Sequence, residues 1–333
     1  MNPPLLSLDD VLQAQTRLAG GVRVTPCALS ARLSELAGMQ IIAKHDYLQA
    51  TGSFKERGAR HALLCLTPAQ RARGVVAASA GNHALGLAFH GRELGVPVTV
   101  VMPRNAPRVK ASRCHTLGAH VVLHGDTYDE ASVHAHALAA THGLAYVHPF
   151  DDLAVMAGQG TLALEALLVE PDVDAVVVPV GGGGLLSGVA TVFKALRPDV
   201  QVIGVEPSHA AGLVAARNAG RPVRTATLPT LADGLAVAQT GAHTFAHARA
   251  FVDDVVTVSE DDLALGLLAA HEAHGVTLEG AGATALAACL AGRLPGLAGK
   301  RVLVALTGCN IDPANHARAL TRARLLRAEM AVV

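Results

Sequence analysis

The stretch PVGGGGLLSG, residues 179–188, joins an apolar run of β-branched residues to an Ala- and Leu-rich segment of helical length. Its four consecutive glycines exceed what a tight strand-to-helix turn requires. Bare backbone can approach a ligand closely there, and free N–H groups at the start of a helix attract an anion. We therefore expect this turn to bind a phosphate group, with a turn that binds nothing as the simpler alternative.

Two nucleotide-binding motifs fit this stretch badly. A Walker A loop would continue with Lys and then Ser or Thr, where this chain has Val189 and Ala190. A dinucleotide-binding fingerprint would carry its third glycine where Ser187 stands. The glycine turn by itself therefore does not indicate a nucleotide ligand.

Outward from this turn, short β-branched runs alternate with helix-length segments along most of the chain. Strands that are apolar throughout are typical of parallel sheets covered by helices on both faces. The alternation predicts an α/β fold with two doubly wound, mainly parallel sheets, one in a large domain and one in a small domain. The expected strands are 40–43, 75–79, 98–102, 120–123, 175–180, 201–205, 255–258 and 302–306. The expected helices include 84–94, 106–117, 128–141, 185–196 and 263–274, the last capped by Ser259.

The composition is that of a globular protein, because 51% of the 333 residues are hydrophobic, 16% are charged and the formal net charge is zero. No block of like charges predicts binding to nucleic acid or to a membrane surface. The first residues do not resemble a signal peptide, and no segment has the ~18 continuous apolar residues of a membrane helix. The five cysteines are scattered without a CxxC pair, which predicts neither disulfides nor a zinc site. We expect a cytoplasmic protein.

The segment TGSFKERG, residues 51–58, contains Lys55, one of only five lysines in the chain. Lys55 alone stands beside an aromatic residue, in a small and glycine-flanked context at the expected start of a helix. Partial desolvation of an amine there would favour its neutral, nucleophilic form. On its own, however, the segment is better explained as a solvated helix lysine beside Glu56.

Two further segments follow expected strands. SAGNH, residues 79–83, offers backbone donors and small side chains that suit a carboxylate, and Asn82 can hydrogen-bond a phenolic oxygen in either direction. An ordinary helix N-cap explains SAGNH about equally well. The last strand ends in LTGCN, where Thr307 places a hydroxyl group, which is a weak signal by itself.

Together these segments resemble the fold-type-II pyridoxal-phosphate enzymes, and more narrowly the threonine/serine dehydratase (ammonia-lyase) and serine racemase branch. TGSFK, SAGNH, PVGGGGLLSG and a hydroxyl residue before Gly-x-Asn occur in the order typical of that branch. GVEP at 204–207, LADGLAV at 231–237 and EGAGA at 279–283 belong to it as well, so the resemblance covers nearly the whole chain. Within the branch the chain looks most like a threonine dehydratase without a regulatory domain, because it ends at Val333, soon after Asn310.

The resemblance implies pyridoxal 5′-phosphate as the cofactor, held as a Schiff base on the catalytic residue Lys55. Cofactor contacts are implied for Phe54, Lys55, Asn82, Gly181, Gly182, Gly183, Gly184, Leu185, Gly234 and Thr307. Substrate contacts are implied for Ser79, Ala80, Gly81, Asn82, His83, Asp233 and Glu279. The family also implies a large catalytic domain made of residues 1–73 and 152–333, a small mobile substrate-binding domain at 74–151, and a homodimer.

The implied reaction is the conversion of an L-β-hydroxy amino acid, L-threonine or L-serine, to a 2-oxo acid and ammonia. Lys55 would remove the Cα proton, and backbone N–H groups of residues 79–83 would hold the substrate carboxylate. Thr307 stands where relatives usually carry Ser and would meet the pyridine nitrogen. A neutral hydroxyl there makes the cofactor a weaker electron sink than a carboxylate would, which suits elimination of a β-substituent.

Two departures from the branch refine these expectations. Racemases carry a second Ser at the position of Ala80, whose methyl group cannot move a proton, so racemisation is disfavoured. Relatives with a divalent-cation site use a Glu, a backbone carbonyl and an Asp. Glu206 and Ala210 match the first two, but Gly212 stands where the Asp should be, so we expect a metal site to be weak or absent.

Several alternatives stay open at this point. A dehydratase of a 3-hydroxyaspartate or a β-aryl serine, a serine racemase-like enzyme, or a β-replacement synthase would share the fold and the cofactor. A nicotinamide-dependent dehydrogenase would leave the Lys55 segment unexplained, and intact Lys55, Asn82 and Thr307 argue against a non-catalytic binding protein. The sequence does not identify the β-substituent of the substrate.

Overall fold

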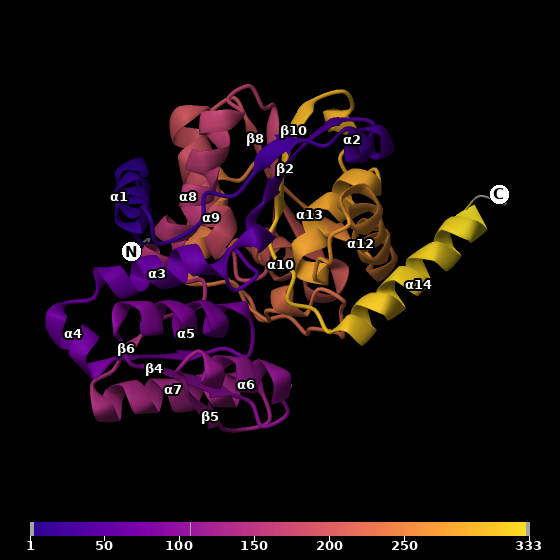
Figure 1. The fold of residues 1–333 in the computed structure, drawn as a ribbon. Coiled ribbons are helices and arrows are strands. Elements are labelled where there is room, and N and C mark those ends of the chain that lie inside the picture. The colour runs from indigo at the N-terminus through magenta and orange to yellow at the C-terminus, as the bar shows by residue number, and fades with distance from the viewer. Residues whose placement is uncertain (1–2, 107, 331–333) are drawn as a thin grey trace.

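The computed structural model describes residues 3–106 and 108–330, and this part of the chain forms two β-sheets (Figure 1). The larger sheet has six strands in the order β1-β2-β10-β7-β8-β9. All neighbours are parallel except β1, which pairs with β2 in antiparallel register. Its strands are β1 (Cys27–Leu29), β2 (Gln40–His45), β7 (Ala175–Pro179), β8 (Gln201–Pro207), β9 (Asp254–Val258) and β10 (Arg301–Leu306).

The smaller sheet comes from one continuous stretch in the first half of the chain. Its four strands are parallel and lie in the order β5-β4-β3-β6. They are β3 (Val75–Ala78), β4 (Val98–Met102), β5 (His120–Leu123) and β6 (Ala145–Tyr146). Every residue of the central strand β3 is buried, as expected for an apolar strand covered on both faces.

Helices cover both faces of each sheet (Figure 1). They are α1 (Leu8–Leu18), α2 (Ala31–Ala37), α3 (Lys55–Cys65), α4 (Pro68–Arg73), α5 (Asn82–Leu94), α6 (Arg108–Thr116), α7 (Tyr128–His142), α8 (Leu153–Val169), α9 (Gly184–Leu196), α10 (Gly212–Ala219), α11 (Ala242–Phe251), α12 (Glu260–His274), α13 (Gly280–Leu290) and α14 (Pro313–Met330). Successive residues of β7 face opposite cores, because side chains alternate along a strand. Val177 packs into the core with Leu286 of α13, whereas Val178 packs into the core with Val189 of α9. Burial of each such side chain contributes roughly 1.5–3 kcal/mol.

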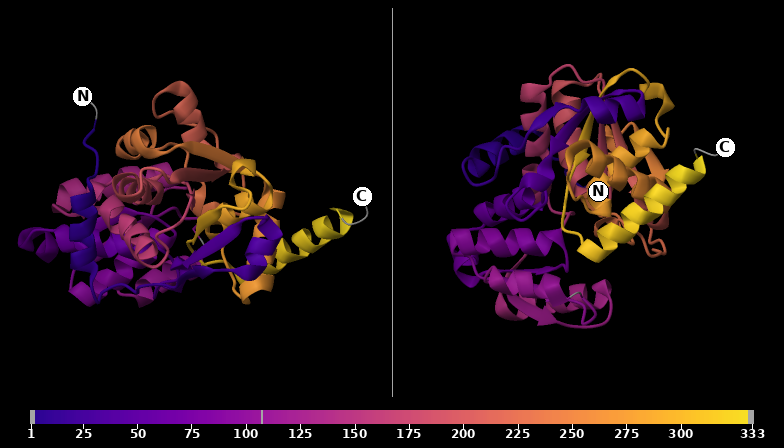
Figure 2. Two further views of the ribbon diagram at one scale, coloured as in Figure 1. Left: turned by 90° about the horizontal axis from the view of Figure 1, so that it is seen from above. Right: turned by 45° about the vertical axis from the view of Figure 1, so that its right-hand side comes forward.

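Helix α3 joins the two halves of the molecule. It contacts α8, which covers the larger sheet, and α5, which covers the smaller one. Helix α3, which begins with Lys55, therefore lies where the two halves meet (Figure 1). The last helix, α14, projects from the body of the protein in both views of Figure 2.

The predicted fold class is confirmed, and all eight expected strands are present within a residue or two of their predicted ends. Ser259 caps α12 as expected, and Asp262 completes a capping box. The sequence did not indicate β1 and β6, which are three and two residues long and too short for an alternation pattern to show. Among the described residues, no helix is both long and apolar enough to cross a membrane.

Candidate active site

Lys55 opens helix α3, with Phe54 directly before it. The Lys55 Nζ donates a hydrogen bond to the carbonyl of Pro149 at 2.7 Å and lies 5.2 Å from the centre of the Phe54 ring. Burial lowers the pKa of this amine to about 8, although the nearby Glu279 carboxylate acts in the opposite direction. A substantial share of Lys55 is therefore neutral near pH 8, as a nucleophile or a base requires.

The glycine turn lies between β7 and α9, where parallel α/β sheets place their ligands. Gly183 adopts φ +93°, which favours glycine, and a Cβ at Gly182 would overlap the ring of Phe150. Within the described part of the chain, no group accepts the N–H of Gly181, Gly182 or Gly183. Together with the unpaired N–H groups of the first turn of α9, they form a nest that fits a phosphate.

Lys55 and the glycine turn meet through one short segment. Pro149 accepts the Lys55 hydrogen bond, and the next residue, Phe150, lies against both Gly182 and Gly184. The Nδ1 of His148 accepts N–H bonds from Phe150 and Asp151, which holds this segment bent. Burial keeps the pKa of His148 at about 4, so its ring stays a neutral acceptor. The sequence offered no signal for this role of residues 148–150.

Residues 79–83 form the turn from β3 into α5. The N–H of Gly81 donates to the hydroxyl of Ser79 at 3.3 Å, and no acceptor within the described residues takes the N–H of Ala80, Asn82 or His83. These donors suit a carboxylate, as the sequence predicts. The His83 ring is buried and faces the Val147 carbonyl at 3.2 Å, so only its backbone N–H remains for a ligand.

Asn82 and Glu279 are brought together from residues far apart in the chain. The Asn82 Nδ2 donates to Glu279 Oε1 at 2.6 Å. Glu279 is 5% exposed, and burial, reinforced by Asp233, raises its pKa to about 7. The carboxyl group therefore changes protonation state near neutral pH, which is typical of catalytic sites.

The end of β10 is joined to the Lys55 segment by backbone hydrogen bonds. The carbonyl of Thr307 accepts the Phe54 N–H at 3.0 Å, and the Cys309 N–H donates to the Gly52 carbonyl at 2.9 Å. Thr307 is buried, and its backbone lies directly beside Phe54, the residue before Lys55. The family resemblance implied this neighbourhood, because it gave both Lys55 and Thr307 as cofactor contacts.

Asp233 begins a short 3₁₀ turn, η3 (Asp233–Leu235), that lies against the glycine turn through Leu235 and Gly181. Its carboxylate lies 3.1 Å from the Nζ of Lys110 in α6. Gly234 lies against Ala281, where a Cβ would come within 3.3 Å. The sequence predicted Asp233 but not Lys110, since only the packing of the two sheets makes them neighbours.

A cavity of about 820 Å³ opens where the two halves of the molecule meet. Gly81, Asn82, Lys110, Asp233 and Asn310 line it, so several predicted site residues share one opening. Lys55 and the glycine turn are not among its lining residues. The cavity therefore adjoins the predicted site through Gly81, Asn82 and Asp233.

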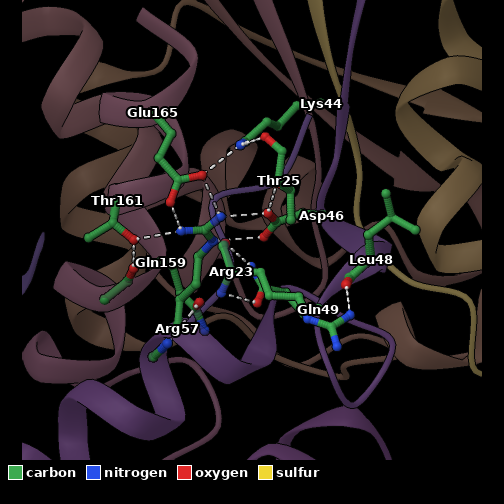
Figure 3. Close-up of polar contacts among 12 residues, drawn as sticks. Arg23, Thr25, Lys44, Asp46, Leu48, Gln49, Arg57, Gln159, Thr161 and Glu165 are labelled. Carbon is green, nitrogen blue, oxygen red and sulfur yellow. Dashed lines mark hydrogen bonds and ion pairs between the residues drawn. The ribbon is translucent and has the colours of Figure 1, made fainter. Parts of the chain in front are cut away.

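A buried cluster of charges holds the first turn of α3 in place (Figure 3). The Arg57 guanidinium binds both carboxylate oxygens of Asp46 and of Glu165 at 2.6–2.8 Å. Lys44 also binds Glu165, at 2.6 Å, so two cations face two anions. Such a buried group is costly to break once formed. Because Arg57 lies two residues after Lys55, the cluster fixes the start of α3 against β2 and α8.

Glu206 is the next-to-last residue of β8 and is fully buried. Its oxygens accept the N–H groups of Leu213 and Val214 at 2.7 and 2.9 Å, at the start of α10. Burial raises its pKa to about 7. The carboxylate predicted to be the remnant of a cation site thus caps a helix that begins with Gly212. The described residues contain no group of three or more His, Cys, Asp or Glu placed to bind a metal ion.

Comparison with known proteins agrees with this geometry. The profile of the family "Pyridoxal-phosphate dependent enzyme" matches residues 18–308. An L-threonine ammonia-lyase of Thermotoga maritima is 45% identical over 308 residues, which are 92% of this chain and 76% of that protein. A threonine deaminase isoform from Solanum lycopersicum superposes with a TM-score of 0.89 at 35% identity, covering 97% of this chain and 91% of that one. A serine racemase from Dictyostelium discoideum superposes with a TM-score of 0.87 at 34% identity, covering 92% of this chain and 99% of that one.

Proposed function

The chain belongs to the pyridoxal-phosphate dependent enzymes and is a lyase of the threonine ammonia-lyase type, and we propose that its substrate is L-threonine, with L-serine as a smaller alternative. The products would be a 2-oxo acid and ammonia. The observation that carries this proposal is the Lys55 amine, whose pKa is lowered to about 8 and which bonds the carbonyl of Pro149, next to the phenylalanine that lies against the glycine turn. The names of the relatives support the choice of L-threonine.

The residues present fit pyridoxal phosphate. The four glycines of the turn suit the phosphate, because there is no room for a Cβ in the turn and N–H groups are left free. The neutral amine of Lys55 suits the aldehyde of the cofactor. Asn82 would bind the phenolic oxygen and Thr307 the ring nitrogen, while Phe54 and Gly234 would lie beside the ring. When bound, the cofactor supplies an electron sink for negative charge at Cα.

The groups around Lys55 would bind and orient the substrate. The N–H groups of residues 79–83 would bind the substrate carboxylate and orient its Cα–H toward Lys55, whose neutral amine would take that proton. Asp233 and Glu279 would contact the substrate's hydroxyl and amine. Elimination of the β-hydroxyl, followed by hydrolysis, accounts for every atom of the 2-oxo acid and the ammonia.

A serine racemase-like activity is the second candidate, favoured by the structural similarity to a serine racemase. Racemisation needs a proton donor on each side of Cα, and Lys55 serves only one side. Ala80 offers a methyl group at the position where racemases of this branch carry a hydroxyl. The elimination is therefore the proposed activity.

Residues 74–151 would form a small domain that moves against residues 1–73 and 152–333. The exposed contact of Lys110 with Asp233 across the cavity supports this division, because such contacts break and re-form at low cost. A cytoplasmic homodimer completes the proposal and rests on the family resemblance.

The direct test is a panel of L-threonine, L-serine, a 3-hydroxyaspartate and a β-aryl serine, with ammonia and 2-oxo acid both measured. We expect L-threonine to give the highest kcat/KM. The purified protein should be yellow and should lose its visible band on borohydride reduction. Preference for another substrate would correct the proposed specificity, whereas a colourless protein without ammonia release would overturn the function.

A further inference from the structure

Two side-chain amides form a hydrogen-bonded row that crosses from the surface of α6 into the site. The Arg113 Nη1 donates to Asn310 Oδ1 at 2.8 Å, Asn310 Nδ2 donates to Asn82 Oδ1 at 2.8 Å, and Asn82 Nδ2 donates to Glu279 Oε1 at 2.6 Å. The four residues come from α6, from the segment after β10, from the start of α5 and from the residue before α13. The row thus connects both halves of the molecule.

The direction of the Asn310 amide is set by two independent neighbours. A guanidinium has no acceptor, so the atom of Asn310 that faces Arg113 must be its oxygen. On the other side Asn310 Nδ2 lies 2.8 Å from the backbone carbonyl of Thr51, which can only accept. Amide orientations are assigned from the hydrogen bonds around them. Here both neighbours require the same orientation of the Asn310 amide.

The orientation of the Asn310 amide determines the orientation of the Asn82 amide. The Asn310 Nδ2 has two hydrogens and uses them on Thr51 and on Asn82 Oδ1. The Asn82 oxygen therefore points toward Asn310, and its Nδ2 points the other way, where Glu279 takes one of its two hydrogens. The sequence alone allows Asn82 to donate or accept, whereas in this row it presents its donor end on the side of Glu279.

Glu279 could not set this direction by itself. Its pKa is raised to about 7, so near neutral pH it exists both as a carboxylate, which only accepts, and as an acid, which can also donate. A protonated Glu279 could bond either end of the Asn82 amide. Only the neighbours on the far side, Asn310 and through it Arg113, distinguish the two orientations.

Two glycines make room for the row. Gly52 has φ +83°, and a Cβ there would lie 3.0 Å from Asn310 Oδ1. A Cβ at Gly308 would overlap the Glu279 carboxyl group and lie 3.3 Å from Asn82 Nδ2. Any side chain at these positions would displace the amides, which are held by direct contacts.

We propose that Asn310 and Arg113 are positioning residues that keep Asn82 a hydrogen-bond donor toward the phenolic oxygen of the cofactor. The inference rests on the proposed function and deepens it. A donor at that oxygen stabilises its ionised form, so it lowers the pKa of the bound cofactor and strengthens cofactor binding.

Asn310→Asp tests the row by replacing the donor with an acceptor of the same shape. The new carboxylate would face the Thr51 carbonyl and Asn82 Oδ1, so the Asn82 amide must turn and lose its donor toward the site. A pH titration of the visible band of the holoenzyme and a dissociation constant for pyridoxal phosphate are the measurements. We expect the spectral pKa to rise by about one unit and the dissociation constant to rise about tenfold. Asn218→Asp, an exposed change of the same kind on α10, should leave both unchanged.

Arg113 provides a second test that does not depend on a buried position, because its side chain is exposed. Arg113→Glu places an acceptor against Asn310 Oδ1 and should shift both quantities in the same direction, by about two- to threefold in the dissociation constant. Arg113→Lys keeps a donor and should restore the wild-type values. If Asn310→Asp does not fold, the comparison of Arg113→Glu with Arg113→Lys tests the inference by itself.

The inference would be overturned if Asn310→Asp and Arg113→Glu both leave the spectral pKa and the cofactor affinity unchanged. This result counts only when the wild-type protein carries its visible band and releases ammonia. A wild-type protein that shows neither the band nor ammonia release would instead overturn the proposed function. The two failures are therefore separate results of the same set of measurements.

Discussion

The Nζ of Lys55 lies 2.7 Å from the carbonyl oxygen of Pro149, the residue before the phenylalanine that covers the glycine turn. One hydrogen bond therefore sets the distance between the amine and the anion nest of residues 181–184. Because the amine is partly desolvated there, its pKa falls to about 8, so a substantial share of it is a neutral nucleophile near that pH.

Lys55→Ala should abolish ammonia release from L-threonine while the fold persists, because the base and the covalent anchor are lost together. The measurements are the steady-state rate and the thermal unfolding midpoint. Lys300→Ala, at an exposed lysine 3.9 Å from Asp174, is the matched control and should keep the wild-type rate. Most of the wild-type rate in the Lys55 variant would remove the central assignment.

The rate at which the apo-enzyme captures pyridoxal phosphate should rise with pH and level off above about pH 8. The ammonium form of Lys55 cannot attack the aldehyde, and its pKa is lowered from 10.5 to about 8, so the neutral amine predominates above that pH. Appearance of the visible band, followed by stopped flow, gives the rate at each pH. A rate that keeps rising to pH 10 would show an ordinary, solvated lysine.

The wild-type enzyme given an L-β-hydroxy amino acid should release ammonia with negligible formation of the D-isomer. The methyl group of Ala80 leaves the face of Cα opposite Lys55 without a proton donor, and Ala80→Ser should introduce one. Chiral chromatography of the remaining amino acid measures both outcomes. Abundant D-isomer from the wild-type protein would refute the choice of elimination over racemisation, whereas none from the Ser variant would show that the hydroxyl lacks supporting geometry.

Chelation with EDTA should leave the activity largely intact. The Glu206 oxygens already accept two backbone N–H groups of α10, and Gly212 supplies no carboxylate. Ammonia release is measured before and after chelation, with and without added magnesium or calcium. Complete loss that either cation restores would show that other groups complete a cation site.

Glu165→Gln should lower the free energy of unfolding by roughly 3–5 kcal/mol, because it leaves the buried Lys44 and Arg57 with one anion between them. Urea unfolding followed by circular dichroism measures the change. Glu35→Gln, which breaks an exposed pair with Arg32, serves as the control and should have no resolvable effect. Equal stabilities of the two variants would show that the cluster in Figure 3 does not stabilise the fold.

Much of the fold follows from local patterns in the sequence. The β-branched runs and the capping residue Ser259 act on their own neighbours, so their effect is visible without a structure. The same holds for the turn at 181–184, where glycine is needed for φ +93° at Gly183 and for the contact of Gly182 with Phe150. The two short strands β1 and β6 were missed because they depend on pairing with a longer strand and not on their own pattern.

The sequence by itself determined the α/β class and the glycine turn, because each depends on residues adjacent in the chain, whereas Lys55 became the candidate nucleophile only through the family resemblance. Only the tertiary structure decided which partner each site residue has. Pro149 for Lys55, Lys110 for Asp233, and Asn310 for Asn82 are all distant in sequence. The direction of the Asn82 amide is the clearest case, because an isolated amide can turn either way. Its orientation follows from a donor on α6 and a carbonyl at Thr51 that only the folded chain brings together.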